Sequence, residues 1–233
     1  MQHIITELLF PRRCPVCDEI VVPWGNLCCK ACVSKLQYLG SNYCMRCGKG
    51  LSRQETEYCQ DCRKYRHMFV RGRSLYRYES VAGAIFRFKY QGRQEYGDFF
   101  AEELYRYLGR DILAMQPDAI IPVPLHSSRQ RERGYNQAQI LGKALAKRCE
   151  LPFRDNLVVR CKKTVPQKQL SRIERQNNLK KAFKLSGNSV KLKKLLIVDD
   201  IYTTGSTVDA VAEVLLGGGA QQIYVVTLAA GME

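Results

Sequence analysis

The chain has 233 residues and a formal net charge of +15, because 37 lysines and arginines outnumber 22 acidic residues. A hydrophobic fraction of 45% with 25% charged residues is typical of a globular protein, and no apolar run approaches the roughly 20 residues that a membrane span needs. Residues 126–194 hold 19 basic and 4 acidic side chains, whereas the rest of the chain holds 18 of each. This distribution excludes a uniformly basic coat and predicts that the segment binds an anion, with phosphate the first candidate.

The first residues indicate the compartment. Residues 1–10 include a short apolar stretch that ends at Pro11-Arg12-Arg13. A basic first region and a small-residue cleavage site are both missing, so the sequence predicts no signal peptide. We therefore expect a cytoplasmic protein without a membrane span, which other proteins could bring to the inner face of the membrane.

Nine of the eleven cysteines precede residue 63, and eight of them form regularly spaced C-x-x-C pairs. A C-x-x-C pair directs two thiolates at one ion, and two pairs complete a four-cysteine zinc site. The alternatives are a disulfide framework or a redox motif, but four evenly spaced pairs in a cytoplasmic chain favour two structural zinc ions. The predicted ligands are Cys14, Cys17, Cys29, Cys32, Cys44, Cys47, Cys59 and Cys62.

The spacing leaves the pairing of these motifs open. Consecutive pairs would give two zinc ribbons, whereas first with third and second with fourth would give a cross-brace. The short intervals suit local hairpins and favour ribbons. Cys28 could replace Cys29 as a ligand, but position 29 keeps the C-x-x-C spacing. We predict a double zinc-ribbon domain over residues 1–65.

An alternation of strands and helices follows the cysteines. Val81, Ala84, Ile85 and Phe88 recur at helical spacing, and residues 195–198 form an uninterrupted apolar run typical of a central parallel strand. Such an alternation predicts an α/β domain with a parallel sheet over residues 66–233. The predicted strands are 74–78, 119–124, 156–160, 195–198 and 222–228, and the predicted helices include 99–108, 136–148 and 207–216.

A nine-residue string from Asp199 to Thr207 follows the apolar run of residues 195–198. In parallel sheets, ligands bind beyond the carboxyl ends of the strands. A turn rich in glycine and hydroxyl groups that opens a helix can bind phosphate, and two adjacent carboxylates can accept hydrogen bonds from a diol. The combination predicts a ribose 5-phosphate site. The alternative is an N-capped helix with two solvated aspartates.

This string resembles the phosphoribosyl pyrophosphate signature of type I phosphoribosyltransferases, although Tyr202 stands where a small aliphatic residue is commoner. The resemblance implies that Asp199 and Asp200 hold the ribose hydroxyls. It also implies a pyrophosphate loop around Pro124 and Leu125, and magnesium that arrives with the pyrophosphate. The 5-phosphate would be bound by Thr203, Thr204, Gly205, Ser206 and Thr207.

Together with the cysteine pairs, two further stretches, 129–138 and 160–183, resemble the ComF family of competence proteins along nearly the whole chain, closest to its ComFC type. The resemblance implies a cytoplasmic protein that handles single-stranded DNA during natural transformation, with the DNA-uptake helicase machinery as a further partner. It also implies a flexible loop over residues 160–184. Residues expected at the pyrophosphate and in that loop are Arg129, Arg133, Arg160, Thr164 and Gln167.

Cations interleaved with an aromatic residue also suit a single strand held without sequence readout. Each of these residues has a plainer interpretation as well, a solvated charge or a tyrosine packed at a helix start. The nucleic-acid candidates are Arg131, Tyr135, Lys162, Lys163, Lys168, Lys180, Lys181 and Lys184.

The sequence leaves more than one function open. A metabolic phosphoribosyltransferase, which would transfer a pentosyl group, is the alternative to a DNA-handling protein with a phosphoribosyl pyrophosphate pocket. A zinc-ribbon docking protein for a helicase is a third hypothesis. No carboxy-terminal segment for an acceptor base and no positioned general base are evident, and His3, His67 and His126 are dispersed. Ligand binding is therefore better supported than turnover.

Overall fold

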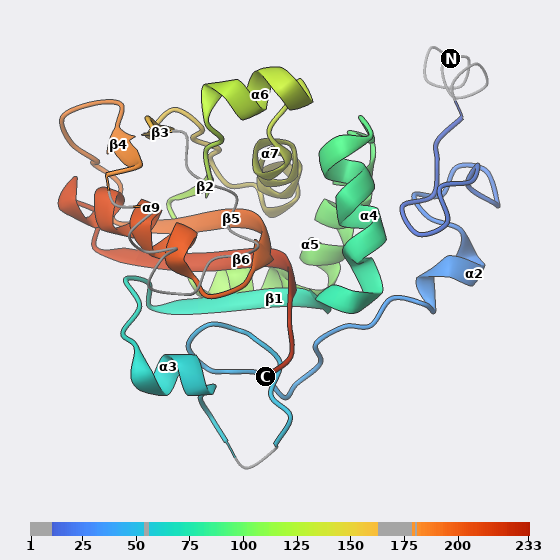
Figure 1. Cartoon of the computed structure of the whole chain (residues 1–233), viewed down its shortest axis with the longest axis horizontal. Helices are drawn as coiled ribbons and strands as arrows, with labels where there is room; N and C mark the ends of the chain where they lie inside the picture. The colour runs from blue at the N-terminus through green and yellow to red at the C-terminus, as the bar shows by residue number, and fades with distance from the viewer. Residues whose placement is uncertain (1–10, 54–55, 163–178, 180) are drawn as a thin grey trace.

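The computed structural model describes residues 11–53, 56–162, 179 and 181–233. In this part of the chain the centre is a sheet of four parallel strands in the order β1-β6-β5-β2. Because all four run in the same direction, their carboxyl ends meet at one edge of the sheet (Figure 1). The strands are β1 Arg71–Arg77, β2 Ala119–Pro122, β5 Lys194–Tyr202 and β6 Gln222–Ala230.

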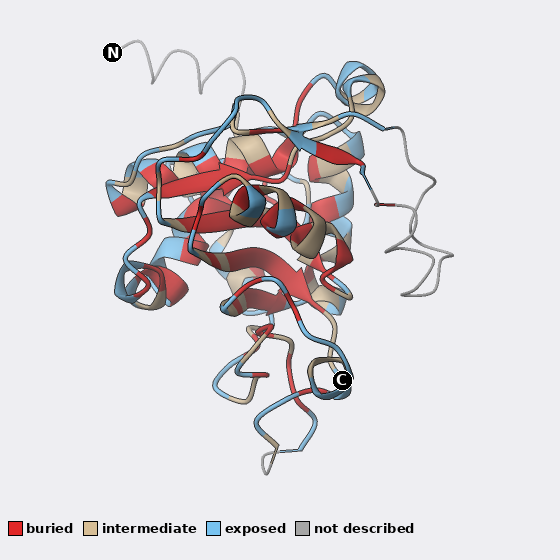
Figure 2. Cartoon of the chain, turned by 90° about the vertical axis from the view of Figure 1, so that its left-hand side faces the viewer, coloured by how far each residue is buried: buried red, intermediate tan, exposed pale blue. Residues whose placement is uncertain are grey.

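Helices cover both faces of this sheet, which confirms the predicted α/β class. Leu196 and Val198 of β5 belong to one apolar core, and Leu195 and Ile197 to the other. The first core is closed by α4 Tyr78–Tyr90, α5 Tyr96–Ala114 and α7 Gln137–Cys149, and the second by α9 Ser206–Gly217 and the hairpin of β3 Val158–Arg160 with β4 Phe183–Leu185. Figure 2 shows the strands buried between helices whose outer faces are exposed.

Two cysteine-rich modules complete the described part of the chain. The first, residues 11–36 with α2 Lys30–Val33, lies beside α4 (Figure 1). The second, residues 37–53 and 56–64 with α3 Gln60–Lys64, runs along the outer edge of β1. There the Leu39 N–H donates to the Leu75 carbonyl at 2.9 Å. This contact covers part of an edge that would otherwise present unpaired backbone groups.

The predicted division at residue 65 falls between α3 and β1 and stays a prediction. Among the helices that the structure describes, none is both long and apolar enough to cross a membrane.

Candidate functional site

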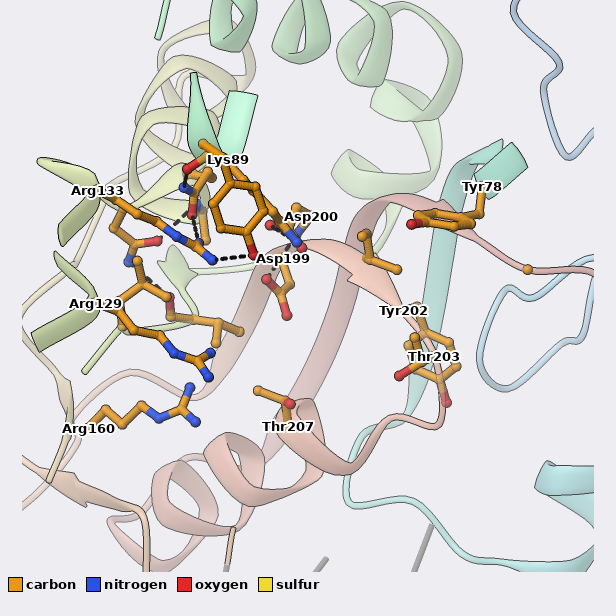
Figure 3. Close-up of a pocket in the computed structure, with 18 of the residues that line it drawn as sticks. Tyr78, Lys89, Arg129, Arg133, Arg160, Asp199, Asp200, Tyr202, Thr203 and Thr207 are labelled. Atoms are coloured by element: carbon orange, nitrogen blue, oxygen red, sulfur yellow. Dashed lines mark hydrogen bonds and ion pairs between the residues drawn. The ribbon is translucent and has the colours of Figure 1, made fainter. Parts of the chain in front are cut away.

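A cavity of about 840 Å³ opens at the carboxyl edge of the sheet. The end of β5, the start of α9, the last turn of α4, helix α6 Ser127–Arg133 and β3 all contribute to its walls. Figure 3 shows arginines on one side, the two aspartates in the middle and Thr207 below them. Eight predicted site residues line this cavity: Leu125, Arg129, Arg133, Arg160, Asp199, Asp200, Thr203 and Thr207.

Of the two adjacent carboxylates, one pairs with a cation and the other accepts a backbone hydrogen bond. Lys89, near the end of α4, places its Nζ 2.8 Å from Oδ2 of Asp200. The Asp200 N–H donates to Oδ1 of Asp199 at 2.9 Å. Burial raises the pKa of Asp199 to about 7, and the charge of Asp200 adds to this effect, while Lys89 opposes it. Near neutral pH, Asp199 can therefore either accept or donate a hydrogen bond.

The turn between β5 and α9 forms a second small hollow, continuous in sequence with the aspartates and lined by Thr203, Gly205, Ser206 and Thr207. Gly205 is the N-cap of α9 and has a φ of +78°, which glycine adopts without strain. Thr204 Oγ1 and Ser206 Oγ lie 3.0 Å apart. Hydroxyl groups and the first N–H groups of a 12-residue helix thus gather where an anion is favoured.

Tyr202 and His67 form the back of this turn. The Tyr202 hydroxyl lies 3.3 Å from Nε2 of His67, and Nδ1 of His67 lies 2.8 Å from Oδ2 of Asp209 on α9. A Cβ on Gly205 would lie 2.6 Å from the Tyr202 hydroxyl oxygen. The large residue at position 202, the departure from the phosphoribosyltransferase pattern, is therefore accommodated by a glycine.

The arginine wall comes from α6 and β3. The His126 side chain caps α6, Gly134 ends it with a φ of 79°, and the helix buries no residue, so it holds its basic side chains at the surface. A backbone bridge between His126 and Arg160 brings β3 alongside. Burial lowers the pKa of Arg160 to about 10, and the nearby charge of Arg129 lowers it further. The two guanidinium groups give this wall a positive field.

The predicted cysteines gather into two four-cysteine clusters. Consecutive pairs combine, Cys14 and Cys17 with Cys29 and Cys32, and the later four likewise, and all sulfurs of a cluster lie within 4.8 Å of one another. The structure therefore has the arrangement of two ribbons, and it places Cys29 rather than Cys28 in the first cluster. The Cys47 and Cys59 sulfurs are 3.7 Å apart, close to the roughly 3.8 Å of a tetrahedral site with 2.3 Å zinc–sulfur bonds.

The second module also forms part of the cavity. Lys49 lies between Cys47 and Cys59 in the sequence and lines the cavity, with an ion pair to Asp61 at 3.1 Å. Met232, which follows β6, lines the cavity too and pairs with Gly50 through a backbone bridge. A four-cysteine cluster and the ligand cavity thus have a common wall.

Comparisons with known proteins agree with both parts of the chain. The family described as double zinc ribbon domain matches residues 5–63, and that described as phosphoribosyl transferase domain matches residues 135–233. Competence protein F of Haemophilus influenzae is 35% identical over 86% of this chain and 83% of its own length. The chain belongs to the Competence protein F/ComFC family. Competence protein ComFC of Bacillus subtilis is 29% identical over 82% of this chain and 78% of its own.

Two further likenesses cover less of the chain. The DNA utilization protein YhgH of Escherichia coli (strain K12) is 39% identical over 47% of this chain and 48% of its own. A purine phosphoribosyltransferase structure from Pyrococcus horikoshii has a TM-score of 0.37 and 18% identity, over 57% of this chain and 74% of that one. The phosphoribosyltransferase-like fold of this ComF family member therefore rests on its strand order and its matched domain.

For this ComF family member the structure favours the plainer of the two interpretations of Tyr135, a tyrosine packed at a helix start. Its side chain is only 7% exposed and its hydroxyl donates to the Phe88 carbonyl. The aromatic side chain at the start of α7 packs into the core because Gly134 turns the chain inward there. It has no free face for stacking.

Other predicted residues lie outside the cavity walls. Arg131, Lys162, Lys181 and Lys184 are exposed at the surface. Pro124 is half-buried between two residues that line the cavity. Thr164, Gln167, Lys163, Lys168 and Lys180 lie outside the described residues.

Several residues of the site were not predicted. Lys89 and Tyr90 are the last two residues of α4, and nothing in the local sequence indicates their contact with the site. Gln137 and Asn136 line the cavity from the start of α7, where the Asn136 side chain caps the helix. Lys49 had no signal at all, because only the folded chain brings the second module to this edge.

Proposed function

We propose that this ComF family member binds phosphoribosyl pyrophosphate in the cavity at the carboxyl edge of the sheet. One observation carries the proposal: two adjacent carboxylates, a glycine- and hydroxyl-rich helix start and three arginines meet in one cavity. A ribose with phosphate groups on two sides needs these three chemistries side by side. Other anions would need the arginines but not Asp199 and Asp200.

Each wall has its own part in this proposal. Asp199 and Asp200 accept hydrogen bonds from the ribose hydroxyls. Lys89 then leaves its ion pair with Asp200 and turns toward the pyrophosphate. Residues 203–207 bind the 5-phosphate. Arg129, Arg133 and Arg160 neutralise the pyrophosphate, which would bring its own magnesium ion.

We further propose that each four-cysteine cluster binds a structural zinc ion. Both clusters have the ligand type and number of such sites, and the second has a fitting sulfur separation. Cys44, Cys47 and Cys59 are buried, so four thiolates without a cation would repel one another in a poorly solvated space. Zinc would supply much of the folding free energy of these small modules.

The relatives' names, competence protein and DNA utilization protein, support a role in handling DNA taken up by the cell, which we propose for this chain in the cytoplasm. Exposed cations flank the cavity: Arg131 on α6, and Lys162 and Lys181 beside Arg160 at the end of the β3–β4 hairpin. Binding to a labelled oligothymidylate should weaken steeply with salt. Binding that is absent or independent of salt would contradict this role.

Calorimetry with phosphoribosyl pyrophosphate and magnesium tests the pocket directly. The wild type should bind, and Asp200→Asn should lose at least tenfold in affinity, because the amide presents an N–H where the ribose hydroxyl needs an acceptor. Glu213→Gln is the matched control, since it removes an exposed acid on α9 and should leave the affinity unchanged. No binding by the wild type, or equal affinities for all three proteins, would reject the assignment.

A further inference from the structure

Two exposed aromatic side chains lie side by side at the end of α4. Phe86 is 52% exposed and Tyr90 is 53% exposed, although burying either ring would be favourable. They are four residues apart and therefore on the same side of the helix, with ring centroids 5.2 Å apart and the rings tilted by 44°. Single exposed apolar residues are common, but here an exposed aromatic pair continues into the cavity, because Tyr90 lines it and Phe86 packs on Tyr90.

The Tyr90 ring is held in place by an arginine of α6. Cζ of Arg133 lies 4.6 Å from the ring centroid, and Nη2 of Arg133 donates to the Tyr90 hydroxyl at 2.9 Å. Nη1 of the same arginine donates to Oε1 of Gln137, a residue only 1% exposed, at 2.9 Å. A buried amide thus orients the guanidinium, and the guanidinium orients the ring. Such pre-organisation reduces the entropy lost when a ligand stacks on the ring.

The position of this ring indicates what would stack on it. Tyr90, Arg133 and Gln137 all line the same cavity as the aspartates. Residue 89, its neighbour in the chain, contacts Asp200 at 2.8 Å. Figure 3 shows Lys89 and Arg133 close to Asp199 and Asp200. A planar group next to a ribose held by these carboxylates would meet the aromatic face, and the surrounding cations favour an occupant that comes with phosphate groups.

We propose that Phe86, Tyr90 and Arg133, here called the aromatic rim, stack a nucleobase. The proposal rests on the proposed ribose site only for the orientation of that base. The base has two sources: it belongs to a single-stranded nucleic acid that passes the cavity, or it is a free base beside phosphoribosyl pyrophosphate. Either source uses the same π face, and the role expected of Tyr135 belongs to Tyr90.

Two decamers with the same number of phosphates distinguish stacking from charge. One is a fluorescently labelled oligothymidylate, and the other is an abasic strand of equal length. Tyr90→Leu should weaken binding of the oligothymidylate about five- to a hundredfold and leave that of the abasic strand within twofold, because stacking contributes about 1–3 kcal/mol per base. Tyr90→Phe keeps the ring and should stay close to the wild type. Tyr105→Leu is the matched control, a tyrosine on α5 with 39% exposure away from the cavity.

Calorimetry with adenine, guanine and uracil at saturating phosphoribosyl pyrophosphate tests the second source. If Tyr90→Leu loses binding of one of these bases and the control variants keep it, the result supports a free base on the rim. If Tyr90→Leu leaves all these ligands unaffected, or weakens both strands equally, the rim is only a latch between α4 and α6 and the proposal is overturned. If the wild type binds no phosphoribosyl pyrophosphate but still distinguishes the two strands through Tyr90, the ribose assignment fails and the rim stands.

Discussion

At the scale of single residues, the cavity disfavours the charge of one of its own carboxyls. Burial raises the pKa of Asp199 to about 7 and the charge of Asp200 adds to it, whereas Lys89, the Asp200 N–H and Arg160 only partly offset the rise. An anion held between these groups would add negative charge. The arginines of the cavity therefore have to neutralise the negative charge of the aspartates as well as that of the ligand.

This shift makes the stability of the unliganded protein depend on pH. The unfolded carboxyl has a pKa of about 3.9, so between about pH 4 and 7 the folded protein binds the proton more tightly, and the free energy of unfolding falls as pH rises through this window. Asp199→Asn removes that loss. A rise of about three pKa units corresponds to roughly 4 kcal/mol, so we expect this variant to exceed the wild type by up to about 4 kcal/mol at pH 8 and by about 1–2 kcal/mol at pH 5. Urea unfolding at both pH values measures the difference.

Asp118→Asn provides a control of opposite sign. The Lys194 and Lys193 N–H groups donate to this exposed carboxyl and lower its pKa. Its contribution is fully present above the unfolded pKa, so the substitution should destabilise the protein equally at pH 5 and pH 8. An Asp199→Asn effect that does not change with pH, or that reverses, would show that the carboxyl is ionised in the folded protein throughout.

At the scale of elements, the turn between β5 and α9 depends on a glycine on one side and on two aromatic residues on the other. Gly205 adopts a positive φ, and Tyr202 and His67 pack where its side chain would be. His67 in turn contacts Asp209 in the first turn of α9 at 2.8 Å. The turn and the helix that would bind the 5-phosphate are thus fixed by the segment that links the second cysteine module to the sheet.

Gly205→Ala should therefore disrupt the turn. The left-handed backbone costs an alanine about 1 kcal/mol, and its Cβ would lie 2.8 Å from Cε1 of His67, so we expect a loss of about 2–4 kcal/mol in the free energy of unfolding. Affinity for phosphoribosyl pyrophosphate should fall as well. Gly217→Ala at the other end of α9 meets nothing within 4 Å and should stay within about 0.5 kcal/mol of the wild type. Thermal denaturation measures both variants, and equal losses of stability would contradict a special role for the backbone at Gly205.

The sequence predicts those elements that bury an apolar face. Val81, Ala84, Ile85 and Phe88 of α4 are buried as their spacing indicates, and the apolar run of β5 lies at the centre of the sheet. Helix α6 was not predicted, because it buries no residue and forms through its caps. The three-residue strand β4 was missed for a similar reason: it is too short to show a period.

The candidate site, too, has a part that the sequence predicts and a part that it does not. The aspartates and the turn after them are contiguous, so the sequence motif contains them. The contacts of Lys89 with Asp200 and of Arg133 with Tyr90 join residues 111 and 43 positions apart. No local pattern encodes such pairs, since they depend on how α4 and α6 pack at the edge of the sheet.

At the scale of the whole molecule, the two cysteine modules have different relations to the cavity. The first docks on α4 and α5: Arg87 donates to the Pro15 and Val16 carbonyls, and Arg93 pairs with Asp18 at 2.9 Å. None of its described residues lines the cavity. The second contributes Lys49 to the cavity wall and packs on the residues that surround it. A Cβ on Gly48 would lie 2.6 Å from the Arg73 backbone, so this module packs closely against β1 at that point.

The basic side chains of residues 126–194 also fall into two groups, one in the cavity and one away from it. Arg129, Arg133 and Arg160 line the cavity, whereas Lys191 and Lys193 precede β5 and lie at the amino end of the sheet. Lys194 and Asp199 are five positions apart, which is roughly 17 Å along a strand. A phosphorylated ligand in the cavity accounts for the arginines but not for these lysines. Only a longer polyanion that extends from the carboxyl ends to the amino ends of the strands would contact both groups.

Two single variants, each lacking one cysteine of one cluster, test the contributions of the two modules independently. Cys17→Ser and Cys62→Ser each remove a less buried sulfur from a four-cysteine cluster, and each should lower the zinc content from two ions to one per chain. Cys62→Ser should weaken binding of phosphoribosyl pyrophosphate at least tenfold, because the wall that contains Lys49 and the packing behind Tyr202 lose their support. Cys17→Ser should bind within about threefold of the wild type, since its module contacts the outside of α4 and α5. Metal analysis and calorimetry on the same samples measure the zinc content and the affinity for phosphoribosyl pyrophosphate. If both variants bind phosphoribosyl pyrophosphate as tightly as the wild type, neither module is part of the pocket. If both lose the same affinity, the two modules act only through global stability.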